Sequence, residues 1–285
     1  MVIVYYANHG NTGTDDSEGH ITYSLEKLGY EVIKVKEGKL SDIPEKADLF
    51  LFHKGGPKIL DALKKVKYPK VFWYFDKVWN DRPQWFASVV PRVDMGFLTD
   101  ETWLKLNPSP KLHILHQGIG EESATLGMKI PKYSGKKIAF LGTPYNGREE
   151  FIKKLKDRYG DDFVQVNNMF NKDLYDFCAT VPIIVAPPYP SDDYYWSSRI
   201  YMVMGSGGFM VHPHLKGLDR EYIGGVDYSG YRDEADMFKK IDYYLSHEKE
   251  REVIRSNGYK KTMDNYTYTR RIASLLTAFE SNNKC

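Results

Sequence analysis

The sequence has few cysteines, no long apolar run and no excess of charge of one sign. The two cysteines among its 285 residues are Cys178 and Cys285, far apart in the chain. This excludes a disulfide framework or a metal knuckle and suits a reducing compartment. No apolar stretch approaches the roughly 18 residues of a membrane span, and the N-terminal MVIVYYANHG has no basic signal-peptide region. We therefore expect a soluble, cytoplasmic protein.

Charge and length narrow the class of protein further. The 40 Lys and Arg against 38 Asp and Glu give a net charge of +2, which argues against a protein that coats nucleic acid but leaves room for a local basic groove. No Cys, His or Asp spacing resembles a metal site, so we expect no metal and no other cofactor. The length suits two domains of about 130 to 150 residues, and we expect a monomer or a weak dimer.

Residues 1–118 alternate between strand and helix patterns. Short apolar runs are typical of buried parallel strands, and helical patterns separate most of them, as at 58–65 and 102–106. Repeated strand–helix units predict a doubly wound parallel sheet, with ligands at the carboxyl ends of its strands. The predicted strands are 2–6, 31–35, 47–52, 71–75, 93–98 and 112–115.

The same alternation restarts after a glycine-bearing linker at 119–135. Strands are predicted at 137–141, 163–166, 182–186 and 209–212, with helices between them and a wholly helical pattern from Asp233 onward. The pattern predicts an α/β protein with two Rossmann-like domains, 1–118 and 136–266, facing a central cleft. Residues 267–285 are predicted to form a helix that crosses back to the N-terminal domain.

Two segments of the second domain have the features of a phosphate site. Arg199 lies in a helical pattern that breaks at glycines, including Gly207 and Gly208, before a short strand. Glycines let backbone approach a ligand closely, and arginine supplies a planar fork that matches phosphate oxygens. The prediction is that Arg199 and this glycine backbone bind a diphosphate.

The second segment, LGTPYNGR, ends with Arg148 where a strand gives way to a helix. Backbone N–H groups at a helix start attract anions, which makes Gly142 and Thr143 candidates for the same diphosphate. Taken alone, this segment also fits an ordinary strand–helix turn with a surface arginine.

The run SSRIYMVMGSGGFMVHPHLKGL, followed by Glu221-Tyr222 and NGYKKTMDNYTYTRR, resembles the C-terminal domain of CgeB-like glycosyltransferases over residues 138–275. The resemblance implies the two-domain GT-B fold and a nucleotide-sugar donor, UDP-linked by expectation, whose diphosphate meets Arg148 and Arg199. Many relatives carry a glutamate for the donor ribose three residues after the arginine, where this chain has Met202. Ribose recognition must then differ, or Glu221 must help, or donor binding is impaired.

The N-terminal half has a weaker similarity to T-even phage DNA β-glucosyltransferases, in VFWYFD, LTDE and ILHQGI. That resemblance implies that Asp76 is the general base and that Glu18 orients the acceptor. A carboxylate that follows a buried strand is partly desolvated, which raises its basicity. An N-cap or surface aspartate is the alternative for Asp76.

Histidines and aromatic rings complete the candidate contacts to sugar and acceptor. His9 and His20 flank the first glycine loop, which contains Gly10, and retaining relatives use a histidine there. Tyr189 and Tyr195 belong to a proline-rich loop whose rings either stack on a base or pack together.

Four questions stay open at this level. The acceptor is unidentified, and a hydroxymethylated DNA base of phage type, a glycan, a protein and a small molecule all fit. The segment VYYANHGNT also resembles a flavodoxin phosphate loop, although Asp15, Asp16 and Glu18 shortly after it would repel FMN phosphate. Because of Met202, a sugar-nucleotide sensor without catalysis is a further alternative, and the anomeric outcome does not follow from the sequence.

Overall fold

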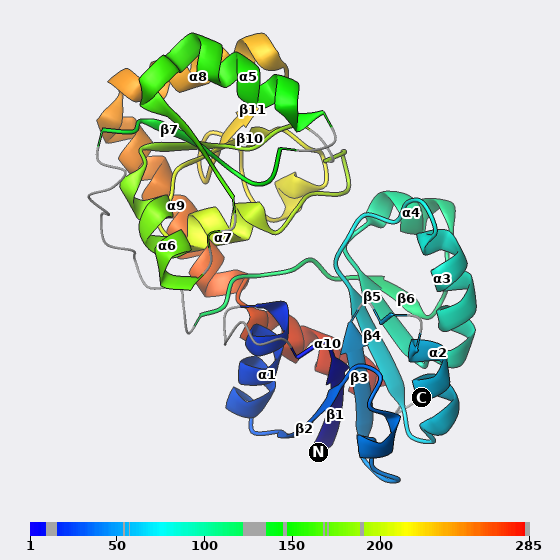
Figure 1. Ribbon diagram of the computed structural model, residues 1–285. Helices are drawn as coiled ribbons and strands as arrows, with labels where there is room; N and C mark the ends of the chain where they lie inside the picture. Colours follow the sequence, from blue (N-terminus) through cyan, green and yellow to red (C-terminus); the bar gives the residue numbers. More distant parts are fainter. Residues whose placement is uncertain are drawn as a thin grey trace. The chain divides into compact units, whose positions relative to one another are not determined.

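The protein consists of two compact units, shown in the computed structural model of Figure 1. The first contains Met1–Gln117 together with the helix that begins at Tyr268, and the second is Gly118–Thr267. The structure describes residues 1–9, 16–53, 55–56, 58–121, 135–144, 147–167, 169, 171–188 and 191–282.

The first unit is built on a six-stranded parallel sheet in the order β2-β1-β3-β4-β5-β6. The strands are β1 (Val2–Ala7), β2 (Glu31–Lys36), β3 (Leu49–His53), β4 (Lys70–Tyr74), β5 (Met95–Leu98) and β6 (Leu112–Ile114). The helices are α1 (Ser17–Lys27), α2 (Ile59–Lys65), α3 (Arg82–Val89), α4 (Glu101–Leu106) and α10 (Tyr268–Asn282), with short 3-10 turns η1 (Leu40–Asp42) and η2 (Val90–Arg92).

Alternation along the strands buries both faces of this sheet. Tyr5 and Trp73 pack with α1 and α10, while the neighbouring Tyr6 and Phe72 pack with α2, α3 and α4. Figure 1 shows these two helical layers on either side of the sheet. The last helix of the chain is therefore part of the first unit's core.

The second unit repeats the arrangement with five parallel strands in the order β11-β10-β9-β7-β8. The strands are β7 (Ile138–Leu141), β8 (Phe163–Val166), β9 (Ile183–Val185), β10 (Met210–Pro213) and β11 (Ser229–Tyr231). The helices are α5 (Arg148–Tyr159), α6 (Asn171–Thr180), α7 (Arg199–Gly205), α8 (Glu234–Ser246) and α9 (Glu248–Asn265), with 3-10 turns η4 (Gly160–Asp162) and η5 (Leu218–Arg220).

Two helical layers also enclose this second sheet. Phe140 and its neighbours on one face pack with α5 and α8, and Leu141 and its neighbours on the other face pack with α6 and α7. No helix in the described part of the chain is both long and apolar enough to cross a membrane.

The α/β fold with two parallel sheets is confirmed, and each predicted strand is present. The expected pattern omits β11, because the sequence Ser-Gly-Tyr at this sheet edge contains no apolar run. Helix α1 begins at Ser17, because the Asp16 side chain accepts a hydrogen bond from the Gly19 N–H and caps it.

The dependence of the first unit on α10 gives a stability prediction. Leu275 is fully buried against the first sheet, so Leu275→Ala should lower the free energy of unfolding of this unit by about 2–5 kcal/mol. Urea denaturation followed by tryptophan fluorescence reports mainly on this unit, because it contains four of the five tryptophans, Trp73, Trp79, Trp85 and Trp103, and only Trp196 belongs to the second unit. Thr277→Ala, at an exposed position of the same helix, is the control. Equal unfolding midpoints for the two variants would contradict a core role for α10.

Candidate active site

A cavity of about 690 Å³ lies in the first unit at the carboxyl edge of its sheet. Asn8 after β1, Glu18 in α1 and His53 at the end of β3 line it, together with Arg82 and Trp85 of α3. Strand β2 lies on one side of β1 and β3 lies on the other. The connections that follow β1 and β3 therefore leave the carboxyl edge of the sheet in opposite directions. Such a switch point is where ligands bind to doubly wound sheets.

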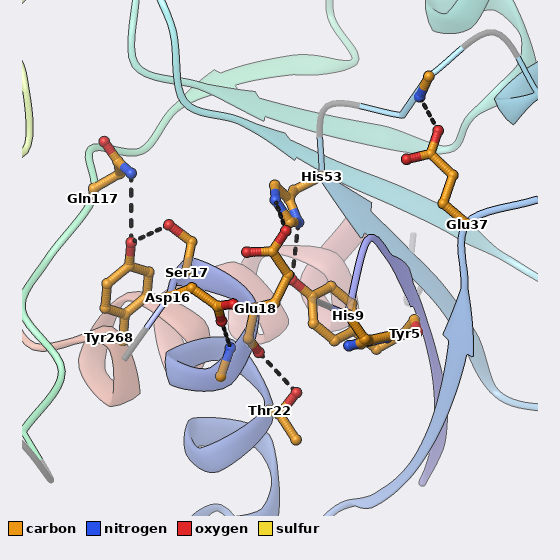
Figure 2. A network of polar contacts seen from close by, with 12 residues as sticks. Tyr5, His9, Asp16, Ser17, Glu18, Thr22, Glu37, His53, Gln117 and Tyr268 are labelled. Carbon is orange, nitrogen blue, oxygen red and sulfur yellow. Dashed lines mark hydrogen bonds and ion pairs between the residues drawn. The ribbon is translucent and has the colours of Figure 1, made fainter. Parts of the chain in front are cut away.

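A chain of polar contacts connects the cavity wall to the sheet (Figure 2). The Nε2 atom of His53 lies 3.2 Å from Oε1 of Glu18, and its Nδ1 atom lies 2.9 Å from the Tyr5 hydroxyl. The imidazole also stacks on Phe75, with 5.1 Å between ring centroids. His9 contacts the backbone oxygen of Tyr5 at 3.1 Å. His53 is thus held on both nitrogens and on one ring face.

The electrostatics of this group follow from burial and from its neighbours. Burial acts to raise the pKa of the Glu18 carboxyl, but the hydrogen bond from His53 and the electrostatic effect of His53, with a contribution from His9, lower it overall. Burial, and then the charge of Glu18, raises the pKa of the Tyr5 phenol well above its ordinary value. Glu18 is therefore ionised and Tyr5 protonated at neutral pH.

The predicted residues of the first unit occupy different positions. Glu18 lines the cavity, and His9 lies close enough to Glu18 to contribute to the lowered pKa of its carboxyl. His20 is buried and stacks on Tyr268 at 5.1 Å between ring centroids, so it packs α1 against α10. Asp76 is half-buried in the loop after β4 and is not among the residues that line the cavity. Gly10 lies outside the described residues.

A smaller cavity of about 200 Å³ lies at the corresponding edge of the second sheet. Gly142 and Thr143 after β7, Asn167 after β8, and Arg199 and Met202 of α7 line it. The strand order reverses between β7 and β9, as it does between β1 and β3 in the first unit. This is the position at which the sequence predicts the donor diphosphate.

Arg199 is fixed in this cavity by three contacts. Its Nε donates to the Leu141 carbonyl at 2.6 Å, and its Nη1 donates to the Ser197 hydroxyl at 3.2 Å. Its guanidinium lies over the Phe140 ring, 5.5 Å from the centroid. A cation held in this way is preorganised for an anionic ligand.

The other predicted arginine approaches the same loop from α5. The Nη1 of Arg148 lies 3.5 Å from the Thr143 carbonyl, but the residue is only 5% exposed and does not line the cavity. Gly142 uses its N–H in a 2.8 Å bond to Val166, and its carbonyl accepts from Gln165. Both backbone groups of Gly142 therefore serve the fold, and its contribution to the site is the space it leaves for Arg199.

Gly207 and Gly208 lie away from this cavity. Helix α7 begins at the carboxyl edge of the sheet and β10 begins at the opposite edge, so the turn between them is at the amino edge. Gly207 has a φ of +76°, and a Cβ on Gly208 would lie within 3.1 Å of the Val203 and Cys178 carbonyl oxygens. These glycines end α7 and allow close packing, which differs from the predicted donor contact.

Glu221 and Tyr195 are engaged within the second unit. The Tyr201 hydroxyl donates to the Glu221 carboxylate, and the Tyr266 hydroxyl donates to the Glu221 carbonyl at 2.8 Å. Tyr195 is buried in a tight turn with Asp192. Tyr189 lies outside the described residues. Neither Glu221 nor Tyr195 lines the 200 Å³ cavity.

The sequence reasoning missed His53 and Tyr5. The signal for His53 was present, because it follows four buried apolar residues at the end of β3, as Asp76 follows a buried aromatic strand. Tyr5 carried no such signal, since its hydroxyl is buried within an otherwise apolar strand. Among the described residues, no group of three or more His, Cys, Asp or Glu side chains could hold a metal ion.

The fold is that of solved GT-B glycosyltransferases. A glycosyltransferase from Rickettsia africae ESF-5 aligns with a TM-score of 0.67 and 10% identity, over 99% of this chain and 98% of that one. HepE of Anabaena, in complex with UDP and glucose, gives 0.66 and 12%, over 98% and 100%. An α-glucosyltransferase in complex with UDP-glucose and DNA containing an abasic site gives 0.68 and 10%, over 99% of each chain. These likenesses show the two-domain GT-B fold.

The family follows from the sequence of the second unit. The family model described as glycosyl transferase-like matches residues 132–277, about half of the chain, and the chain belongs to that family. The protein is therefore a glycosyltransferase. This model does not single out the CgeB-like group, which stays a prediction. No curated protein matches the sequence.

The contact between Gly142 and Arg199 gives a second prediction. Gly142 has a φ of +147°, and a Cβ would lie 2.9 Å from Phe140 and 3.0 Å from Nη2 of Arg199. Gly142→Ala should therefore destabilise the second unit by about 1–3 kcal/mol more than a glycine change without a clash. Gly160→Ala is the control, because Gly160 also has a positive φ but a Cβ there would meet no atom within 4 Å. Urea denaturation followed by circular dichroism measures the difference, and equal losses would refute the steric argument.

Proposed function

We propose that this glycosyltransferase moves a sugar from a UDP-sugar to a hydroxyl acceptor. The observation that carries the proposal is Arg199, fixed by backbone and ring contacts in a cavity at the switch point of the second sheet. A nucleotide diphosphate presents the negative charge that such a cation favours. The Anabaena and DNA-bound neighbours, solved with UDP and with UDP-glucose, support UDP as the nucleotide.

The chemistry requires stabilisation of the departing diphosphate. As the bond between the sugar and the diphosphate breaks, negative charge grows on the diphosphate oxygen, and a preorganised guanidinium stabilises that charge. Arg199 is in position to do this directly. Arg148, buried on the Thr143 carbonyl, reinforces the same loop and contributes a second positive charge nearby.

Met202 distinguishes this donor site from the glutamate-bearing relatives described above. Its side chain lines the cavity, and its sulfur lies 3.7 Å from the Ser198 hydroxyl. A thioether does not accept hydrogen bonds from a ribose as a carboxylate does. We propose that the ribose is held by other groups in this cavity, and turnover of the bound donor separates an enzyme from a sugar-nucleotide sensor.

The acceptor, we propose, is a hydroxyl compound without phosphate, such as a saccharide, bound in the first unit's cavity. Three carboxylates, Glu18, Glu37 and Asp81, and one guanidinium, Arg82, are among the charged groups that line it. An acidic lining repels a phosphodiester backbone, and Trp85 offers an aromatic surface for a sugar ring. A modified DNA base is the second candidate, because a structural neighbour was solved with DNA.

The donor site is tested by removing its cation. Arg199→Ala should weaken UDP binding roughly 10- to 150-fold, which corresponds to the loss of about 1.5–3 kcal/mol for a charge-assisted hydrogen bond. Isothermal titration calorimetry with UDP measures this, and UDP-sugar turnover should be lost as well. Arg232→Ala, which removes an arginine with an 81% exposed side chain from the same unit, is the control. Unchanged UDP affinity in Arg199→Ala would remove the proposed diphosphate site.

The acceptor class is tested by salt dependence. Transfer to a neutral or amino-sugar glycoside should change little when salt rises from about 50 to about 200 mM, whereas a duplex held by 6 to 10 phosphate contacts would lose roughly 10³- to 10⁵-fold in affinity. Release of UDP from UDP-glucose is measured with glycosides and with hydroxymethylcytosine DNA as acceptors. Stimulation by DNA alone, with a steep loss in salt, would establish the DNA alternative instead.

A further inference from the structure

His53 has both ring nitrogens in contact with other side chains, and this determines what it can do. Glu18 lies at Nε2 and the Tyr5 hydroxyl at Nδ1. An ionised carboxylate only accepts hydrogen bonds, so Nε2 must carry a proton, and in the neutral ring Nδ1 then accepts from Tyr5. His53 therefore has no nitrogen lone pair to offer to a substrate in the cavity.

We propose that Glu18 accepts the proton of the acceptor hydroxyl, and that His53, its tautomer fixed by Tyr5, is the positioning residue for Glu18. This inference rests on the proposed function and names the residues that act on the acceptor side. Glu18 lines the 690 Å³ cavity with its side chain 18% exposed, whereas that of His53 is 7% exposed. A hydroxyl in the cavity thus reaches the carboxylate, which is the more exposed of the two groups.

The transfer step balances with this assignment. The acceptor oxygen forms a bond to the anomeric carbon as its own O–H bond breaks, and the proton goes to a carboxylate oxygen of Glu18. The bond between the anomeric carbon and the diphosphate oxygen breaks, and its electron pair leaves on the diphosphate. Attack assisted by a separate base corresponds to inversion at the anomeric carbon, so the proposal commits to that outcome.

The position of Glu18 is determined by both ends of its side chain. Its backbone lies in the first turn of α1, where Asp16 caps the helix and Thr22 bonds to the Glu18 carbonyl at 2.8 Å. Its carboxylate is held by His53 from β3. A carboxylate held from two elements loses little conformational freedom when the acceptor binds.

Several ionisable groups face this pair from the surrounding elements. His53 from β3 and His9 after β1 both favour the ionised carboxylate of Glu18. Tyr5 from β1 faces the other side of His53, and Asp16 of the α1 cap and Tyr268 of α10 act electrostatically on Tyr5. With His53 removed, the pKa of Glu18 should rise, because the contact that lowers it most is gone.

Nuclear magnetic resonance of the full chain with ¹⁵N-labelled histidine tests the geometry without turnover. His53→Gln identifies the His53 signals. We expect the neutral Nε2–H tautomer in the wild type and a mixture of tautomers in Tyr5→Phe. An Nδ1–H tautomer in the wild type, or a tautomer that does not change in Tyr5→Phe, would overturn the proposal.

Kinetics test the roles of the two residues. Glu18→Gln should lower kcat for UDP release from UDP-glucose by about 10²- to 10⁴-fold while leaving UDP affinity unchanged. In His53→Gln, kcat should fall less, and the acidic limb of its pH profile should move to higher pH, because activity requires ionised Glu18. A merely structural His53 would lower kcat equally at every pH. The matched control is Glu26→Gln, an exposed glutamate of α1 paired with Lys34, which should behave as wild type.

The variant Asp76→Asn tests whether Asp76, instead of Glu18, is the base. Full loss of turnover in Asp76→Asn together with normal turnover in Glu18→Gln would assign the proton to Asp76 and overturn the inference alone. Absence of UDP binding in the wild type would instead overturn the proposed function, and the tautomer of His53 would still decide its relation to Glu18.

Discussion

The parallel direction of the strands is the constraint on which both candidate sites depend. Each neighbouring pair in the two sheets runs parallel, so every strand within a sheet delivers its carboxyl end to the same edge. In each unit the second strand lies on one side of the first and the third strand on the other, which opens a gap in the helical cover. His53 and Arg199 reach cavities at these two edges because the sheets are wound in the same order.

Local pattern was enough to predict the sheets but not every residue at their edges. Apolar runs identify a buried strand such as β7 directly, whereas β11 is too short and polar to be seen in this way. The candidate site residues were harder to predict, because the position of a residue in a loop does not determine the direction of its side chain. Asp76 and His53 both follow buried strands, yet only His53 lines the cavity. The contact between Glu18 and His53 joins residues 35 positions apart and requires the packing of α1 beside β3, which no local spacing encodes.

The glycines of the second unit illustrate the same limit. Sequence reasoning assigned Gly142 and the Gly207–Gly208 pair to backbone contacts with the donor, since glycine permits close approach. In the structure Gly142 and Gly208 permit close approach of protein to protein, and Gly207 provides a positive φ of +76°. Gly142 admits the Arg199 guanidinium, and Gly208 admits the carbonyls of α6 and α7. A glycine therefore predicts that another group approaches its backbone closely, but it does not predict whether that group belongs to a ligand or to the protein. The edge of the sheet at which the glycine lies decides between the two.

The signs of charge in the two cavities correspond to the direction in which charge moves during glycosyl transfer. The second unit presents a guanidinium for the proposed leaving diphosphate, which gains negative charge, and the first presents a carboxylate for the proposed acceptor hydroxyl, which loses a proton. Each charge is held by neighbours in its own unit: Arg199 by Leu141 and Phe140, Glu18 by His53. Because neither group needs the other unit to fix its position, each is ordered before a substrate binds. Substrate binding energy is then available for bringing donor and acceptor together, instead of for ordering side chains.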